Sequence, residues 1–399
     1  MERQPLGIGV IGAGNIVKRH AQAFRSLPAL AKLVAVADVD PKRAREAKER
    51  FEFEHAYENY AELLGREDVH AVSICTPAGL HTRMVLDAIA AGKHVLCEKP
   101  LATTLADTDD IIAAADQHPD QTVCGVFQLR ADPTHRRMRW LIGEGHLGRV
   151  LLARLCVRVR KQSSYFAGGG GRGTWKVDGG GVVMNQAIHQ LDALLTFLGE
   201  PVEVSATMDT LVHPIETEDT LTGWVRFESG ARATIECTSC AKKKEFSIDV
   251  LGENAGMRVA GDPDSHHFDW RIDAMGSAAR KALQSTGYRQ VPEPRDPKSA
   301  VMTIQKLMAK LRWREWNPPV HWGHTPFVQE FLQAASAKQP GPVPPREARR
   351  TIALATALYE SARTGRSVQW PVDQRSGLYH GVGAAKESPA PHQEKVHAR

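Results

Sequence analysis

One segment of the chain carries side chains that could bind or move a proton. It runs from Gly179 to Asp192, and within it Asn185 and His189 are four residues apart, so on a helix they would share a face. Asp192, three residues beyond His189, could orient the ring and fix which nitrogen carries the proton. The glycines before this helix leave room for a ligand. A histidine on a helix is more often structural, but the neighbouring Asn185, Asp192 and glycines favour acid–base chemistry at His189.

A second segment, Glu98-Lys99-Pro100, follows a short apolar run. If that run is a strand of a parallel sheet, its carboxyl end is where ligands bind. Lys99 could donate to a substrate hydroxyl or help to move its proton. Glu98 could hold Lys99 or touch the ribose of a bound cofactor. Taken alone, such a turn can equally well be solvent-facing structure.

The chain begins with a motif that predicts dinucleotide binding. An apolar run over residues 6–11 leads into Gly12-Ala13-Gly14-Asn15-Ile16 and then a helix. Gly12 permits the tight turn, and Gly14 lets the backbone approach a pyrophosphate at the helix N-terminus. Val17 stands where the full motif has a third glycine. The glycines could also serve the turn alone, but the complete strand–helix–strand unit favours a cofactor.

Two residues near the end of the second expected strand bear on the choice of cofactor. Asp38 stands where an acid binds the adenosine ribose hydroxyls, and its carboxylate would repel the extra phosphate of NADP. Arg43 could stack on adenine or reach a phosphate. We therefore expect NAD, with NADP less favoured.

The elements that must position these groups fall into two domains. Strand and helix signals alternate through about residue 125, which predicts a parallel sheet in an α/β Rossmann domain over residues 1–128. Alternating strands with a turn at Ser229-Gly230 then predict an α+β domain over residues 129–374, with a large, mainly antiparallel open sheet. Residues 261–319 read as irregular. Residues 375–399 lack periodicity and are expected to be a disordered tail.

Composition excludes several classes of protein. The net charge is +5 over 399 residues, with no dense basic stripe, so we expect no nucleic-acid partner. No apolar stretch is long enough for a membrane helix, and the N-terminus does not resemble a signal peptide, so we expect a cytoplasmic protein. Cys237 and Cys240 form a C-x-x-C without a second pair or histidines at ligand spacing, so no metal site is expected.

Taken together, these motifs resemble the Gfo/Idh/MocA family of oxidoreductases, named for glucose–fructose oxidoreductase and inositol dehydrogenase. The resemblance extends from Gly7 to about Pro371. It rests on Gly7 to Asn15, Thr76-Pro77 followed by His81, Glu98-Lys99-Pro100, Asn185 to Asp192, and Tyr359 to Arg366. These motifs are specific to the family but not to one substrate.

The resemblance implies that Lys99 and His189 work as a pair beside the nicotinamide. Related inositol dehydrogenases have an aspartate four residues before the histidine, where this chain has Asn185. Asparagine cannot take up a proton but can hydrogen-bond a hydroxyl. Ala78 stands where many relatives have asparagine. The family also implies cofactor contacts from Thr76, Pro77 and His81, and homodimers or homotetramers formed through the open sheet face.

The expected reaction is hydride transfer between NAD(P) and a secondary hydroxyl of a sugar, sugar derivative or cyclitol. The basic residues Arg154, Arg158, Arg160, Lys161 and Arg172 suggest an acidic or nucleotide-linked sugar, although they could also lie on a solvated or interface face. Two alternatives stay open: a glycoside-cleaving enzyme that oxidises its sugar transiently, and a non-catalytic protein that senses the cofactor or a metabolite. Candidates to bind the polyol are Gln128, Arg130, Tyr165, Arg172, Trp175 and Gln186.

Overall fold

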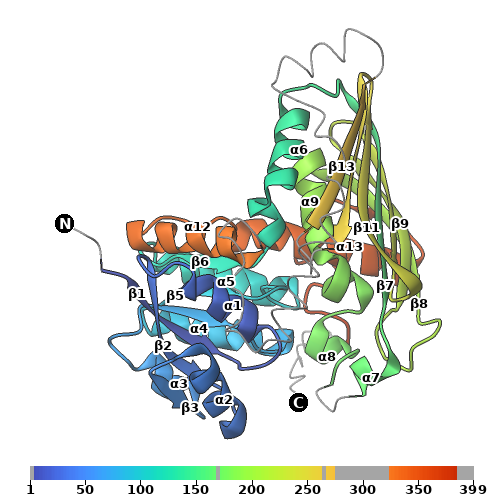
Figure 1. The fold of residues 1–399 in the computed structure, drawn as a ribbon. Helices are drawn as coiled ribbons and strands as arrows, with labels where there is room; N and C mark the ends of the chain where they lie inside the picture. The colour runs from blue at the N-terminus through green and yellow to red at the C-terminus, as the bar shows by residue number, and fades with distance from the viewer. Residues whose placement is uncertain (1–3, 168–170, 263–266, 275–322, 384–399) are drawn as a thin grey trace, which may run out of the picture.

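The computed structural model describes residues 4–167, 171–262, 267–274 and 323–383. It contains two sheets, seen at the lower left and upper right of Figure 1. The first has six parallel strands in the order β3-β2-β1-β4-β5-β6. These strands are β1 (Leu6–Ile11), β2 (Ala31–Ala37), β3 (His55–Tyr57), β4 (Ala71–Ile74), β5 (His94–Cys97) and β6 (Val123–Gly125). The predicted Rossmann fold is confirmed.

Helical segments connect these strands: α1 (Val17–Arg25), α2 (Pro41–Phe51), α3 (Tyr60–Leu64), η1 (Ala78–Leu80), α4 (His81–Ala90) and α5 (Leu105–Gln117). Local chemistry explains where they begin. The Asp40 carboxylate accepts hydrogen bonds from the N–H groups of Lys42 and Arg43, and Pro41 takes the first helical position of α2, as the sequence predicts. All six strands run the same way, so the loops that follow β1, β2, β4 and β5 lie along one edge of the sheet.

The second sheet has eight strands in the order β13-β12-β11-β7-β10-β9-β8-β14. Only β7 and β10 pair in parallel, so the predicted mainly antiparallel sheet is confirmed. Its strands are β7 (Val150–Arg160), β8 (Pro201–Asp209), β9 (Thr220–Phe227), β10 (Arg232–Thr238), β11 (Cys240–Gly252), β12 (Ala255–Asp262), β13 (His267–Ala274) and β14 (Val368–Gln369). The turn at Gly230, where φ is +84°, joins β9 to β10 as predicted.

Helices cover one face of this sheet, and α9 and α13 lie directly against it. The helical segments of this part of the chain are η2 (Gln128–Ala131), α6 (Pro133–Gly143), α7 (Ser163–Phe166), α8 (Trp175–Asp178), η3 (Val183–Ala187), α9 (Ile188–Leu198), α12 (His324–Ala337) and α13 (Pro345–Thr364). The other face carries the ion pairs of Arg158 with Glu236 and Glu245, and the exposed side chains of Leu152 and Trp224.

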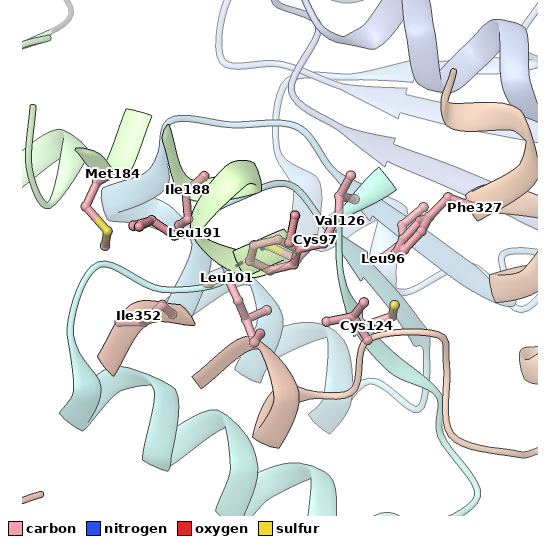
Figure 2. Packing of buried hydrophobic residues seen from close by; sticks show 14 of the residues in the cluster. Leu96, Cys97, Leu101, Cys124, Val126, Met184, Ile188, Leu191, Phe327 and Ile352 are labelled. Atoms are coloured by element: carbon pink, nitrogen blue, oxygen red, sulfur yellow. Dashed lines mark hydrogen bonds between the residues drawn. The ribbon is translucent and has the colours of Figure 1, made fainter. Parts of the chain in front are cut away.

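The two sheets share a core (Figure 2). Leu96 of β5, Cys124 of β6, Ile188 of α9, Phe327 of α12 and Ile352 of α13 are all fully buried in one cluster. Because α12 packs on α1, and α13 packs on α5 as well as on α9 and β8, the C-terminal helices join both halves of the molecule. The predicted division at residue 128 therefore remains an interpretation of the chain order.

The structure differs from the sequence predictions in three places. His55–Tyr57 and His267–Ala274 are strands that we did not predict, and the second, in which apolar and polar residues alternate, lies in the stretch that we expected to be irregular. Residues 375–383 form turns rather than the start of a disordered tail, because Tyr379 is buried and donates to the Asp109 carboxylate at 2.8 Å. The remaining predictions, of an irregular stretch and a disordered tail, fall on residues 275–322 and 384–399, which lie outside the described residues. No helix in the described ranges is long and apolar enough to cross a membrane.

Candidate active site

The turn after β1 has the geometry that a dinucleotide needs. Gly12 has φ +99°, and a Cβ there would lie 2.8 Å from the carbonyl carbon and oxygen of Cys75, so only glycine fits. A Cβ on Gly14 would meet no protein atom within 4 Å. One glycine is thus required by the fold, and the other borders space that the protein leaves open.

Donors for an anion surround this open space. Among the described residues, no acceptor is found for the N–H groups of Gly14, Asn15 and Ile16, and Ile16 offers the start of α1 no side-chain cap. Free N–H groups at a helix N-terminus favour a phosphate. These residues therefore fit the pyrophosphate of a dinucleotide.

Asp38 fixes the turn as well as facing the cofactor position. Its Oδ2 accepts from the Ala13 N–H at 2.8 Å and its Oδ1 from the Asp40 N–H at 2.9 Å. The half-buried carboxylate stays at the end of β2, where the ribose prediction needs it. Arg43 is exposed and lies 3.4 Å from Asp40. It is not held toward the cofactor position.

The Glu98 side chain does not take the role that the sequence suggested. It is buried, and its Oε1 lies 2.8 Å from Nε2 of His20 on α1 and 3.5 Å from Nε2 of His324 on α12. Its Oε2 accepts from the Lys99 backbone N–H, so it holds Lys99 only through the backbone. Glu98 therefore points into the contact between α1 and α12.

Charge explains why this carboxylate is tolerated in the interior. Burial opposes ionisation, but hydrogen bonds from His20 and His324 outweigh it and hold the pKa of Glu98 well below its usual range. Burial likewise opposes the charged form of His20, but Cys75 and Glu98 raise the pKa of His20 to about 10. The 2.8 Å contact suits this ion pair, whereas two ligands of a tetrahedral zinc ion would lie about 3.3 Å apart.

His81 ties two of the strand-end loops together. Its ring nitrogens lie 2.9 Å from the Thr76 carbonyl oxygen and 2.7 Å from that of Pro100. Burial lowers the pKa of the ring. His81 thus positions the loops after β4 and β5, and its predicted cofactor contact stays a prediction. Thr76 and Pro77 stay at the surface of that loop.

Lys99 reaches from the first sheet to the second half of the molecule. Its Nζ donates to the Asn185 carbonyl oxygen at 2.7 Å. Asn185 lies in η3, a π-helical turn that runs directly into α9 and His189. Such turns often occur at functional sites. His189 is buried, and its ring lies edge-on to Phe127, with centroids 6.0 Å apart. The predicted pair of segments is therefore brought together.

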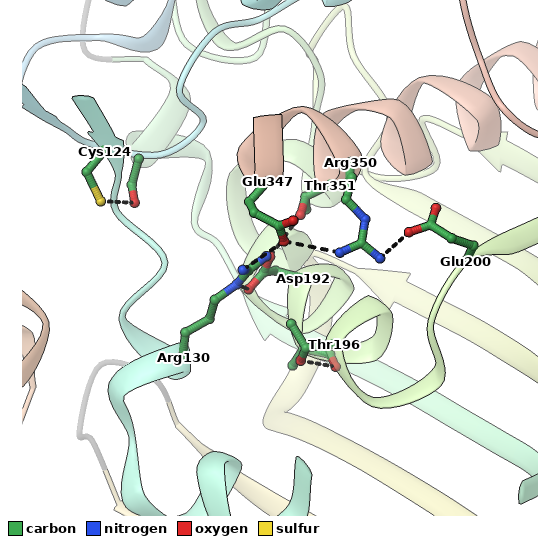
Figure 3. Close-up of polar contacts among 10 residues, drawn as sticks. Cys124, Arg130, Asp192, Thr196, Glu200, Glu347, Arg350 and Thr351 are labelled. Carbon is green, nitrogen blue, oxygen red and sulfur yellow. Dashed lines mark hydrogen bonds and ion pairs between the residues drawn. The ribbon is translucent and has the colours of Figure 1, made fainter. Parts of the chain in front are cut away.

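Asp192 belongs to a different cluster (Figure 3). Its carboxylate accepts from Nη2 and Nε of Arg130 at 2.7 and 2.9 Å, and from Thr351 Oγ1 at 3.0 Å. Arg130 also donates to Glu347 at 3.1 Å. We expected Asp192 to orient His189, whereas the structure pairs its carboxylate with Arg130 and Thr351. Arg130, a predicted substrate ligand, forms ion pairs with Asp192 and Glu347.

A residue that the sequence did not suggest holds the glycine-rich approach in place. Glu218 is buried, and its carboxylate accepts from the N–H groups of Gly181 and Val183 and from the Tyr359 hydroxyl. Burial outweighs these hydrogen bonds and raises its pKa to about 7. The only sequence signal is an acid before a strand, which is typical of ordinary surface turns.

A pocket opens beside these residues. It is lined by Tyr165, Asn185 and Gln186, and also by Lys161 and Glu218. The Asn185 Oδ1 accepts from the Tyr165 hydroxyl at 3.4 Å and from Gln186 Nε2 at 2.8 Å. Tyr165 and Gln186, which we expected to bind substrate, are therefore placed at this pocket.

The other candidate ligands lie around its edge or behind it. Arg172 is exposed and packs over the Tyr165 ring. Trp175 packs edge-on against Tyr359, with centroids 5.1 Å apart. Gln128 is buried, and its Oε1 finds no partner in the described part of the chain. It directly follows Phe127, the ring against His189.

Family models of known proteins match both the first-sheet and the second-sheet parts of the chain. The model of an oxidoreductase family with an NAD-binding Rossmann fold, GFO/IDH/MocA, matches residues 6–126, and the model of the GFO/IDH/MocA C-terminal domain matches residues 135–258. The uncharacterized oxidoreductase YrbE of Bacillus subtilis is 30% identical over 57% of this chain and 65% of its own length. The inositol 2-dehydrogenase of Burkholderia ambifaria is 32% identical over 65% of this chain and 74% of its own length.

A solved structure is similar to nearly the whole chain. The WlbA dehydrogenase from Bordetella pertussis, in complex with NADH and UDP-GlcNAcA, aligns with a TM-score of 0.77 and 26% identity. The alignment covers 94% of this chain and all of that one.

Proposed function

The chain belongs to the GFO/IDH/MocA family of NAD-binding oxidoreductases, whose relatives act on sugars or cyclitols, and we propose that it transfers hydride between NAD and a secondary hydroxyl of such a substrate. The observation that carries the proposal is the contact of Lys99 with the Asn185 carbonyl oxygen. It joins the carboxyl end of a Rossmann strand to the helix that carries His189 and to the pocket.

The residues that would hold NAD are those of the glycine turn and Asp38. The free N–H groups at the start of α1 fit the pyrophosphate, and the Asp38 carboxylate favours NAD over NADP by repelling a 2′-phosphate. Bound NAD supplies the hydride acceptor or donor.

The protein's own contribution is to bind the hydroxyl and handle its proton. Lys99 and His189 are the proposed proton carriers, with Lys99 held by Asn185 and the His189 ring enclosed by Phe127. Asn185 offers its amide to a substrate hydroxyl, since it cannot itself take up a proton. Asp192 has no part in this mechanism.

The proposal is tested by His189→Ala. Loss of a proton carrier should cut kcat by about 100-fold or more, measured as NADH formation with a panel of inositols, aldoses and anhydrosugars. NADH affinity, measured by fluorescence titration, should not change. His118→Ala, at an exposed position after α5, is the matched control and should keep full turnover.

Other outcomes separate the alternatives. Near-normal turnover in His189→Ala would remove that residue from the mechanism. Cleavage of a glycoside without net NADH formation, by protein that retains NAD, would favour transient oxidation. NADH binding without turnover of any substrate in the panel would favour a sensor.

A further inference from the structure

Glu218 caps the start of η3 from a distant part of the chain. The first N–H groups of a helix have no acceptor within the helix itself. The Glu218 carboxylate accepts from the Gly181 N–H at 2.7 Å and from the Val183 N–H at 3.0 Å. The Glu218 carbonyl oxygen accepts from the N–H group between them, that of Val182, at 3.1 Å. One residue, 37 positions beyond Gly181, therefore satisfies three consecutive donors.

Tyr359 of α13 completes this cap. Its hydroxyl group accepts from the Met184 N–H at 3.3 Å and donates to Glu218 Oε1 at 2.9 Å. Glu218 and Tyr359 are only 2% and 3% exposed, so bulk water is not at hand to replace these contacts. The N–H groups of residues 181–184 thus depend on two buried residues that lie far along the chain.

The glycine run before η3 is explained by this cap. A Cβ on Gly180 would lie 2.2 Å from the Tyr359 hydroxyl oxygen. A Cβ on Gly181 would lie 1.7 Å from the Glu218 carbonyl oxygen. Neither position has room for a side chain, so the glycines that we expected to leave room for a ligand also let the backbone approach its cap.

The capped turn presents the carbonyl oxygen that holds Lys99. Asn185 directly follows Met184, and its N–H donates to the Gly181 carbonyl oxygen at 3.0 Å. The Asn185 carbonyl oxygen accepts from Lys99 Nζ at 2.7 Å. Because a carbonyl oxygen moves only with its backbone, the placement of this first turn decides where the Lys99 ammonium group is held.

We propose that Glu218 and Tyr359 are positioning residues for hydride transfer, because their cap on η3 fixes the Asn185 carbonyl oxygen that holds Lys99. The inference rests on the proposed function for the role of Lys99. In this role both residues act through the backbone of η3 rather than on the substrate. A displacement of about 1 Å, caused far from the reacting atoms, can cost about 100-fold in rate.

The mildest test is Tyr359→Phe, which removes the hydroxyl and keeps the ring that packs against Trp175. We expect kcat to fall by about 10-fold while KM and NADH affinity stay within about threefold, because the binding groups remain and only their alignment is lost. Tyr379→Phe is the matched control. It removes another buried tyrosine hydroxyl that donates to a carboxylate, that of Asp109 at 2.8 Å, and should keep full turnover.

Substitutions of Glu218 grade the effect. Assays run at pH 8, above the pKa of about 7 that burial gives Glu218, so that its carboxylate is mostly ionised. Glu218→Gln keeps one acceptor oxygen and should lower kcat by about 10-fold, whereas Glu218→Ala removes both and should lower it by about 100-fold. This partial rescue by the amide is expected of an acceptor that holds N–H groups in place.

Amide hydrogen exchange reports on the cap without any turnover. Exchange of a peptide over residues 181–188 should be at least about 10-fold faster in the three variants than in the parent or in Tyr379→Phe. Unchanged exchange in this peptide, or a kcat of Tyr359→Phe within about twofold of the parent, would overturn the inference and leave the proposed function standing. Faster exchange in the variants of a parent protein that turns over no substrate of the panel would instead overturn the proposed function, on which the positioning role rests.

Discussion

The substitution Asp192→Asn separates two roles that one residue could have. Sequence spacing made Asp192 the partner of His189, whereas the structure pairs it with Arg130 and Thr351. The first role predicts a loss of turnover, and the second a loss of stability. The amide keeps the size of the side chain and removes its charge.

The size of the stability loss follows from the contacts. Asp192 is fully buried, and the Arg130 side chain is 11% exposed, so the pair is largely shielded from water. Removing one partner of a buried ion pair typically costs about 3–5 kcal/mol. Because Arg130 keeps Glu347 at 3.1 Å, we expect the lower end, about 3 kcal/mol. That corresponds to a fall in Tm of roughly 6–12 °C for a domain of about 150–250 residues.

Thermal unfolding and kinetics together decide between the roles. Thr351→Val removes one hydroxyl hydrogen bond to the same carboxylate and should cost about 1.5 kcal/mol, less than the loss of the ion pair. The kcat of folded Asp192→Asn should stay within about threefold of the parent, whereas amidating an aspartate that fixes a catalytic histidine costs on the order of 10⁴. Unchanged Tm with a large fall in kcat would refute the structural assignment.

Two further substitutions test the cofactor turn and the buried acid. Gly14→Ala should leave Tm unchanged, because its Cβ meets no protein atom, yet weaken NADH binding by about 10-fold or more if cofactor fills that space. The control Gly143→Ala, equally open at the end of α6, should leave NADH affinity unchanged. Unaltered NADH affinity in Gly14→Ala would place the cofactor elsewhere. Glu218 has a folded pKa of about 7, above its usual 4.5, so its protonated form is favoured by folding and its contribution to stability is lost as pH rises through about 7. The parent should therefore lose about 3 kcal/mol relative to Glu218→Gln between pH 4 and pH 8, measured by urea unfolding. A difference that is flat across this range would contradict the shifted pKa.

Periodicity and capping predicted most of the fold because they report local physics. Buried parallel strands read as continuous apolar runs, and Asp40-Pro41 marks a helix start with its own hydrogen bonds. Local sequence does not determine which strands pair with one another in a sheet. The parallel contact of β7 with β10 depends on the order in which strands join the sheet, and the alternating residues of β13 stand in a stretch whose aspartates and prolines are typical of a loop.

In the candidate site, too, the local arrangement could be predicted and the long-range contacts could not. Helical spacing predicted that Asn185 and His189 lie on one helix, and they lie on the consecutive segments η3 and α9, but spacing says nothing of what packs against each side. Asp192 therefore met Arg130, and Glu98 met His20. The burial of His20 could have been predicted, because it shares the apolar face of α1 with Val17 and Phe24. Its partner Glu98 could not, since Glu98 lies 78 residues further along the chain.

The packing of α12 on α1 also constrains the order in which this protein can fold during its synthesis. The start of α12 is 299 residues beyond the end of α1. At 5–20 residues per second, the ribosome needs roughly 15–60 s to supply it. During that interval α1 lacks the partner that covers it, and Glu98 lacks His324. The nucleotide-binding half of the nascent chain therefore cannot complete its packing until α12 has been synthesised. A chain that ends before α12 leaves an apolar surface exposed to chaperones or aggregation.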